Sequence, residues 1–159
     1  MIDQLAVSDV LLDGTKEIFE TMVFMDLEPA VDQNLKIEGD SLLGSITFTG
    51  DFEGCITICC NMSCANAIAA NMLGLDDSHE LAEEEVCDAI GEIANMIMGS
   101  VKSRLAGTVD KLDVSIPSVV SGRRLENSLG ENSSHTSLKV DIAQEHVAEL
   151  CILYRKGSR

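Results

Sequence analysis

The order of apolar patterns along the chain constrains its fold more than any other feature. A helical pattern is followed by three β-branched segments, and further helical patterns are again followed by three such segments. Short β-branched segments separated by Gly- and Asp-containing turns are typical of antiparallel strands. An antiparallel sheet of about six strands, with long helices packed on one face, buries the apolar side of both element types, so we expect an α+β fold.

The boundaries follow from spacing and from capping residues. The first helix is expected over 3–25, where apolar residues recur at helical spacing before Pro29. Two later helices are expected over 63–73, between Ser63 and Gly74, and over 78–105, between Ser78 and Gly107. The six expected strands cover 34–40, 42–50, 52–60, 112–120, 135–143 and 148–155.

Length and charge restrict the class of protein. The 159 residues suit a single domain over 1–159, and the net charge of −16 repels nucleic-acid backbones and anionic membrane surfaces. The start of the chain lacks a basic segment before an apolar run, and no apolar stretch is long enough to span a bilayer. We therefore expect a soluble cytoplasmic protein that binds neither nucleic acid nor membrane.

Four of the six cysteines lie in one short cluster, formed by Cys55, Cys59, Cys60 and Cys64. Their spacing matches neither a CxxC pair nor a zinc ribbon. On a strand, Cys55 and Cys59 point to one side and Cys60 to the other, as expected for small core residues in a reducing compartment. A metal or disulfide role is the alternative.

The segment 88–99 combines an apolar stripe with a polar one. At about 100° per residue, Asp88, Glu92 and Asn95 share one face of a helix. The opposite face holds apolar residues that can pack on a core, namely Val86, Ile90, Ile93 and Ile97. Gly91 and Gly99 flank the polar face, although each glycine costs a helix about 0.5–1 kcal/mol relative to alanine. They leave room for another molecule to approach the backbone.

The polar face carries a carboxylate and an amide but no obvious nucleophile. An amide such as Asn95 can hold a water molecule and direct its lone pair at an electrophile, which suits hydrolysis of a phosphoryl group. A solvated helix face is the alternative. Met96 and Met98 beside it are expected to pack in or near the core, with an adaptable contact rim as the other interpretation.

Two further patterns have competing interpretations. Asp13, Glu17 and Glu20 have the same spacing as the polar residues of 88–95. This repeat indicates an internal αβββ duplication, or it arises by chance because acidic residues are frequent in this chain. His79, with Asp76, Asp77 and Glu80, could be drawn as a metal site. Acidic residues at a helix start are favoured by the helix dipole anyway, and we expect no metal there.

The segments "AIGEIANMIMG" and "VSIPSVVSGRRL" resemble the CheX family of chemotaxis phosphatases, relatives of CheC. The family pattern is Asp or Ser, three residues, Glu, two residues and Asn, with a proline some twenty-odd residues later. Asp88, Glu92, Asn95 and Pro117 match it. The resemblance extends over nearly the whole chain, including "GSITFTGDFEGCITICC" and the helix after it.

The resemblance implies hydrolysis of the aspartyl phosphate of a CheY-type response regulator. Glu92 is then expected to contact the active-site lysine of the regulator, Asn95 to hold the attacking water in line with phosphorus, and Asp88 to support the site. Magnesium is expected on the regulator, with no cofactor on this chain. Because Glu20 stands where a second Asn would be needed, the chain resembles the single-site members, which form homodimers. The alternative is a non-catalytic adaptor that binds response regulators or flagellar switch components.

Overall fold

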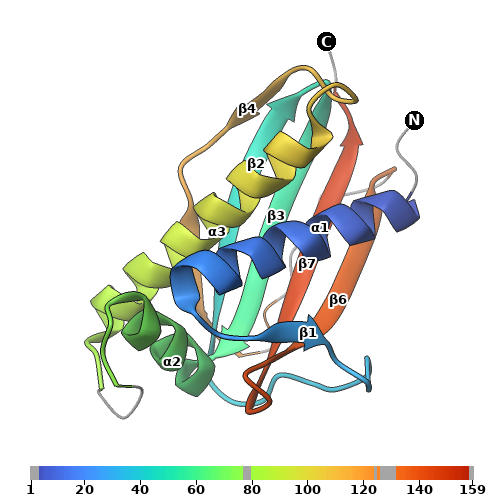
Figure 1. Cartoon of the computed structure of the whole chain (residues 1–159). Helices are drawn as coiled ribbons and strands as arrows, with labels where there is room; N and C mark the ends of the chain where they lie inside the picture. The colour runs from blue at the N-terminus through green and yellow to red at the C-terminus, as the bar shows by residue number, and fades with distance from the viewer. Residues whose placement is uncertain (1–3, 77–79, 124, 126–131, 158–159) are drawn as a thin grey trace.

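A computed structural model describes residues 4–76, 80–123, 125 and 132–157. One layer of helices covers one face of a seven-stranded sheet in which all paired neighbours are antiparallel (Figure 1). This arrangement confirms the expected α+β class. No helix among the described residues is long and apolar enough to cross a membrane.

The helical elements are α1 (Gln4–Ile18), the π-helical turn η1 (Phe19–Val23), α2 (Met62–Met72) and α3 (Glu83–Leu105). The strands are β1 (Leu27–Pro29), β2 (Ser41–Gly50), β3 (Phe52–Asn61), β4 (Leu112–Val114), β5 (Ser118–Gly122), β6 (Ser134–Ile142) and β7 (His146–Lys156). The strand order in the sheet is β1-β6-β7-β3-β2-β4, and β5 also pairs with β2.

The two halves of the chain occupy equivalent places in this sheet. β2–β3 and β6–β7 are hairpins, and their last strands, β3 and β7, pair at the centre. The short first strand of each half crosses to the other half: β1 pairs with β6, while β4 and β5 pair with β2. The strand order therefore maps onto itself when the halves are exchanged, which favours the duplication interpretation.

The core lies between the helices and one face of the sheet. Alternate residues of β3 and β7, such as Ile56, Ile58 and Leu150, point into it and meet α1 and α3. α3 lies very close to β2 at Gly44, where an added Cβ would lie 2.8 Å from Ile90 Cγ2. A glycine at this position lets the helix rest directly on the sheet.

Two predicted elements near the N-terminus are wrong in detail. The first helix changes to a π-helical turn after Ile18, and Phe24 ends it in the left-handed conformation. No strand forms over 34–40, where every residue except Ile37 is exposed, and the side chain of the preceding Gln33 pairs with the backbone of β6. Its Nε2 donates to Lys139 O (2.9 Å), and its Oε1 accepts from Lys139 N (2.9 Å). β1 is the strand that pairs with β6 instead.

Three other boundaries differ from expectation. Asn61 caps α2 in place of Ser63, since its Oδ1 accepts from Cys64 N (2.9 Å). α3 begins at Glu83, and Ser78 lies outside the described residues. The strand predicted over 112–120 is divided into β4 and β5 around Pro117, which has no backbone N–H to donate to a sheet.

Candidate functional site

α3 presents the predicted polar stripe to solvent. Asp88, Glu92, Asn95 and Gly99 are all exposed, at spacings of four, three and four residues. The opposite face is fully buried, with Ile90, Ile93 and Ile97 at 0% exposure. The predicted division of this helix into an apolar and a polar face is thus confirmed.

The helix ends reinforce this placement. The first turn is acidic (Glu83, Glu84 and Glu85), and the last turn carries Lys102 and Arg104, as favoured by the helix dipole. Ala82 N donates to Glu85 Oε1 (3.3 Å) at the start. Charge at both ends and isoleucine packing in the middle make α3 a rigid platform for the stripe.

The two glycines of α3 differ in their surroundings. Gly91 is buried, and an added Cβ would lie 3.5 Å from Val119 Cγ2 and 3.8 Å from Pro117 Cγ. The chain therefore places Pro117 directly beside the stripe, on the side of β5. An added Cβ at Gly99 would meet no atom within 4 Å, so the helix backbone is open to an approaching molecule there.

A serine holds the Pro117 segment in place. Where β4 ends, Ser115 Oγ accepts from Thr47 N (3.1 Å), lies 2.8 Å from Thr47 Oγ1 and donates to Ile116 O (3.1 Å). Ser115 N also donates to Thr47 O (2.9 Å). These bonds keep the segment on β2 although Pro117 interrupts the strand. No local pattern singles out Ser115, because its partner is distant in the chain.

The polar groups of the stripe are not engaged by the part of the chain that the structure describes. Asp88, Glu92 and Asn95 make no hydrogen bond or ion pair with any residue that the structure describes. Neighbouring Cys87 is not set up as a nucleophile, because burial, then Glu83 and Asp88, raise the pKa of its thiol. A carboxylate and an amide with free hydrogen-bonding capacity are what this face offers to a partner.

The matching stripe on α1 is in a different state. Asp13, Glu17 and Glu20 are exposed as well. However, Glu17 Oε1 accepts from Ser100 Oγ (2.8 Å), and Glu17 Oε2 lies 3.4 Å from an Arg104 guanidinium nitrogen. The α1 carboxylate that corresponds to Glu92 therefore ties α1 to α3.

The β3 cysteines of the cluster lie on the two faces of the sheet, as expected from their alternation along the strand. Cys60 and Cys64 belong to the core, whereas Cys55 lies on the opposite face of the sheet beside Cys151. None of the six cysteines, all of which the structure describes, forms a disulfide. Among the described residues, no group of three or more His, Cys, Asp or Glu is arranged to hold a metal, and His79 with Asp77 lies outside them.

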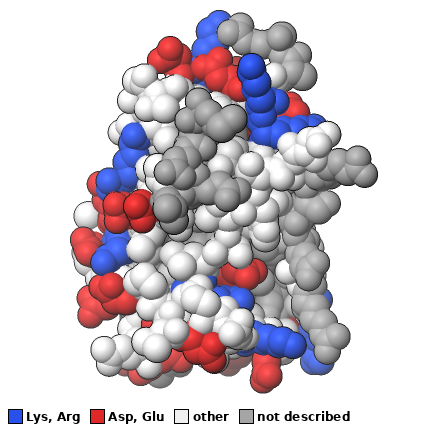
Figure 2. Space-filling model, turned by 90° about the vertical axis from the view of Figure 1, so that its right-hand side faces the viewer, with Lys and Arg blue, Asp and Glu red and all other residues white. Residues whose placement is uncertain are grey.

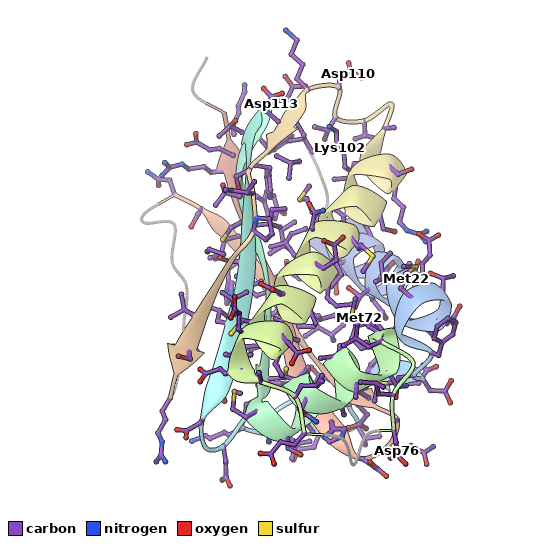
Figure 3. All side chains as sticks on the ribbon, turned by 90° about the vertical axis from the view of Figure 1, so that its left-hand side faces the viewer. Met22, Met72, Asp76, Lys102, Asp110 and Asp113 are labelled. Atoms are coloured by element: carbon purple, nitrogen blue, oxygen red, sulfur yellow. The ribbon has the colours of Figure 1, made fainter. Side chains whose placement is uncertain are left out.

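Surface charge is mixed on the side that Figure 2 displays. Basic side chains are interspersed with acidic ones there, and much of the described surface between them is uncharged. Figure 3 shows the other side of the molecule, where α3 lies between the sheet and the ends of α1 and α2. Met98 is buried, as its expected packing role requires. Met96 is half-buried, so part of its side chain packs near the core and part stays accessible beside the stripe.

Comparisons with known proteins agree on one family. The model of the family described as "Chemotaxis phosphatase CheX" matches residues 42–142, which include the α3 stripe and Pro117. A curated relative, the CheY-P phosphatase CheX of Thermotoga maritima, is 33% identical over 86 residues, or 54% of this chain and 55% of that protein. The matched part of the chain thus spans about half the length of the curated relative.

Solved structures share the whole architecture. The chemotaxis protein CheX from Vibrio vulnificus has a TM-score of 0.80 at 25% identity, over 98% of this chain and 100% of that chain. A chain of the CheX–CheY–BeF3–Mg2+ complex from Borrelia burgdorferi has a TM-score of 0.70 at 19% identity, over 98% of this chain and 100% of that chain. The latter likeness concerns the fold alone.

Proposed function

The chain belongs to the CheX family of chemotaxis phosphatases, and we propose that it hydrolyses the aspartyl phosphate of a CheY-type response regulator. The observation that carries the proposal is the α3 stripe. It presents Glu92 and Asn95 without a hydrogen-bond or ion-pair partner among the described residues, beside the open backbone at Gly99. The Thermotoga maritima relative is named for the same activity.

Asn95 acts on the water molecule. Its side-chain oxygen accepts a hydrogen bond from the water and so turns the water lone pair toward phosphorus, opposite the aspartyl oxygen. The new oxygen–phosphorus bond forms as the bond to the aspartyl carboxylate breaks. The products are inorganic phosphate and a free aspartate, and the water proton passes to phosphate or solvent. Such in-line displacement depends mainly on alignment and charge stabilisation.

Glu92 positions the regulator. One turn of α3 separates it from Asn95, so an ion pair between Glu92 and the active-site lysine of the regulator brings the amide over the phosphoryl group. Asp88, a further turn away, supports this contact. Gly91 lets Pro117 pack close to the helix, and Gly99 leaves room for the regulator backbone.

Magnesium belongs to the regulator in this proposal and offsets the negative charge of the phosphoryl group. The Borrelia burgdorferi complex contains Mg2+ together with CheY and BeF3, which supports this placement of the metal. The residues of this chain hold the regulator, orient the water and exclude bulk solvent. Because its substrate is an intracellular signalling protein, we place the protein in the cytoplasm.

A homodimer is part of the same proposal. β1 covers β6 only at 140–142, and Gln33 covers Lys139. Residues 134–138 of β6 have no partner strand on that edge among the described residues, and a free sheet edge can pair with a second copy. Light scattering on the purified chain tests this: the mass of two chains supports the dimer, and the mass of one contradicts it.

The phosphate lifetime of a purified regulator tests the activity. The proposed phosphatase shortens this lifetime in proportion to its concentration, with a turnover number above one. A non-catalytic adaptor binds the regulator and leaves the lifetime unchanged. Binding without acceleration, across the regulators of the same genome, would contradict the proposed function.

A further inference from the structure

Apolar side chains gather on the solvent side of the helix layer, where η1 meets the end of α2. Met22 is 45% exposed, Phe24 70% and Leu73 57%, and Met72, which directly precedes Leu73, is half-buried. Figure 3 shows Met22 and Met72 close together on this outer surface. These four residues are called the apolar rim below. Exposed apolar side chains gathered in one region often mark an interaction site.

The apolar rim is held rigidly by backbone contacts. Asn71 Nδ2 donates to Val23 O (3.0 Å), which fixes the end of α2 against the end of η1. α2 itself stops in a Schellman motif, in which Leu75 N donates to Ala70 O (2.8 Å) and Gly74 N donates to Asn71 O (3.1 Å). The exposed side chains are therefore presented by a fixed backbone.

Phe24 is an unusual residue for its conformation. It closes η1 with φ 61° and ψ 40°, and its N donates to Phe19 O (2.7 Å). Asn or Gly suits a left-handed position, whereas a bulky side chain is disfavoured there. Folding gains little from an aromatic ring that is mostly exposed. Strained residues and π-helical turns concentrate at functional sites, which favours a role outside the fold.

The apolar rim continues into the stripe of α3. Arg104 contacts Asp13 O, and Ser100 contacts Glu17, so α1 and α3 run antiparallel. Extending this register by one turn brings η1 beside Met96, a half-buried residue next to Asn95. Figure 1 likewise shows the end of α1 beside the middle of α3. Met96 thus joins the apolar rim to the catalytic face.

Charge around the apolar rim indicates what kind of surface it fits. Glu20 and Asp26 flank Met22 and Phe24, and both are exposed. The complex with a partner that places an apolar patch on this surface is stabilised if lysine or arginine residues surround the patch, because they attract these two carboxylates. Glu92 also requires a cation in the same partner under the proposed function.

We propose that the apolar rim is the docking surface for the phosphorylated response regulator, which would contact it through an apolar patch bordered by basic residues. This proposal rests on the proposed function. Docking on the apolar rim sets the affinity and orientation of the regulator, while Asn95 carries the chemistry. Flexible methionines beside a fixed aromatic ring suit a surface that accepts more than one regulator.

Phe24→Asn separates a docking role from a structural one. Asn tolerates the left-handed conformation, so the melting temperature should stay unchanged or rise. Loss of a central aromatic anchor should raise KM for the phosphorylated regulator about tenfold or more, with kcat unchanged. Val31→Asn is the matched control, because Val31 is 101% exposed beside β1. This substitution should change neither the melting temperature nor KM. Leu73→Gln on α2 provides a second variant with the same expected rise in KM.

Two results would overturn the docking role. The first is a KM of Phe24→Asn equal to that of the wild type, whether or not its melting temperature falls. The second is a variant that dissociates a dimer without loss of regulator affinity, which identifies a second copy as the occupant.

The proposed function fails separately if the wild type shows no phosphatase activity. Binding to a regulator activated by beryllofluoride and Mg2+ then decides docking. Loss of this binding in Phe24→Asn supports the docking role, whereas unchanged binding in the variant, or no binding by the wild type, overturns it.

Discussion

Gly44→Ala should lift α3 from the sheet. The added Cβ would lie 2.8 Å from Ile90 Cγ2 and 3.3 Å from Ile90 O, so both the side chain and the helix backbone must move. Overpacking of a core costs about 1–3 kcal/mol of unfolding free energy. For a domain of this size each kcal/mol lowers the melting temperature by about 2–4 °C, which gives an expected fall of about 2–12 °C.

Gly99→Ala is the matched control on the same helix. Its Cβ would meet no atom within 4 Å. Replacing a helical glycine by alanine stabilises by about 0.5–1 kcal/mol, so the melting temperature should rise by about 1–4 °C. Its affinity for the regulator should nevertheless fall if Gly99 gives the partner access to the backbone.

Thermal unfolding followed by circular dichroism, at one protein concentration, measures both changes. The packing of α3 on β2 requires opposite signs for the two alanine variants. A Gly44→Ala protein as stable as the wild type, or a Gly99→Ala protein less stable than it, would refute this description of α3.

Three further perturbations test the buried face of α3, the Glu92 contact and the buried thiols. Ile93→Asp places an unpaired charge at a position of 0% exposure and should give insoluble or unfolded protein; a monodisperse variant with a normal melting temperature would contradict the burial of this face. Glu92→Lys should weaken regulator binding and turnover by like-charge repulsion, and Glu92→Gln should have a smaller effect. Normal turnover in Glu92→Lys would contradict the proposed ion pair between Glu92 and the regulator lysine. Burial raises the pKa of Cys59 to about 11 and of Cys151 to about 12, from an ordinary value of 9.0. Unfolded thiols ionise first, so the free energy of unfolding measured by urea titration should fall as pH rises above the ordinary value, and a flat profile would contradict the burial.

The faces of α3 could be predicted because one period governs them. Apolar residues at helical spacing had to face the sheet, which left Asp88, Glu92 and Asn95 on the solvent side. The same reasoning placed Cys60 in the core and Cys55 on the other face of its strand. The roles of Glu92 and Asn95 stay predictions, because free side chains on an exposed face show availability and not chemistry.

Features set by distant contacts could not be predicted from local patterns. No strand forms over 34–40, and the side chain of Gln33 just before this segment pairs instead with the backbone of the distant Lys139. Pro117 reaches Gly91 only because β4 and β5 both pair with β2. The exposed Phe24 follows from a π-helical turn that a pattern of apolar residues does not distinguish from an ordinary helix end.

The decay of phosphorylated regulator in a single turnover, at saturating wild-type protein and at saturating Asn95→Ala, tests the central claim most directly. Saturation removes differences in binding, so the comparison reports the step in which water attacks phosphorus. Asn95 is exposed and lies away from the buried face, so the variant should fold and bind normally. Loss of the water alignment should cost about 2–4 kcal/mol in barrier, or about 30- to 1,000-fold in rate. Decay as fast with Asn95→Ala as with the wild type would contradict the assignment of the α3 stripe as the catalytic face.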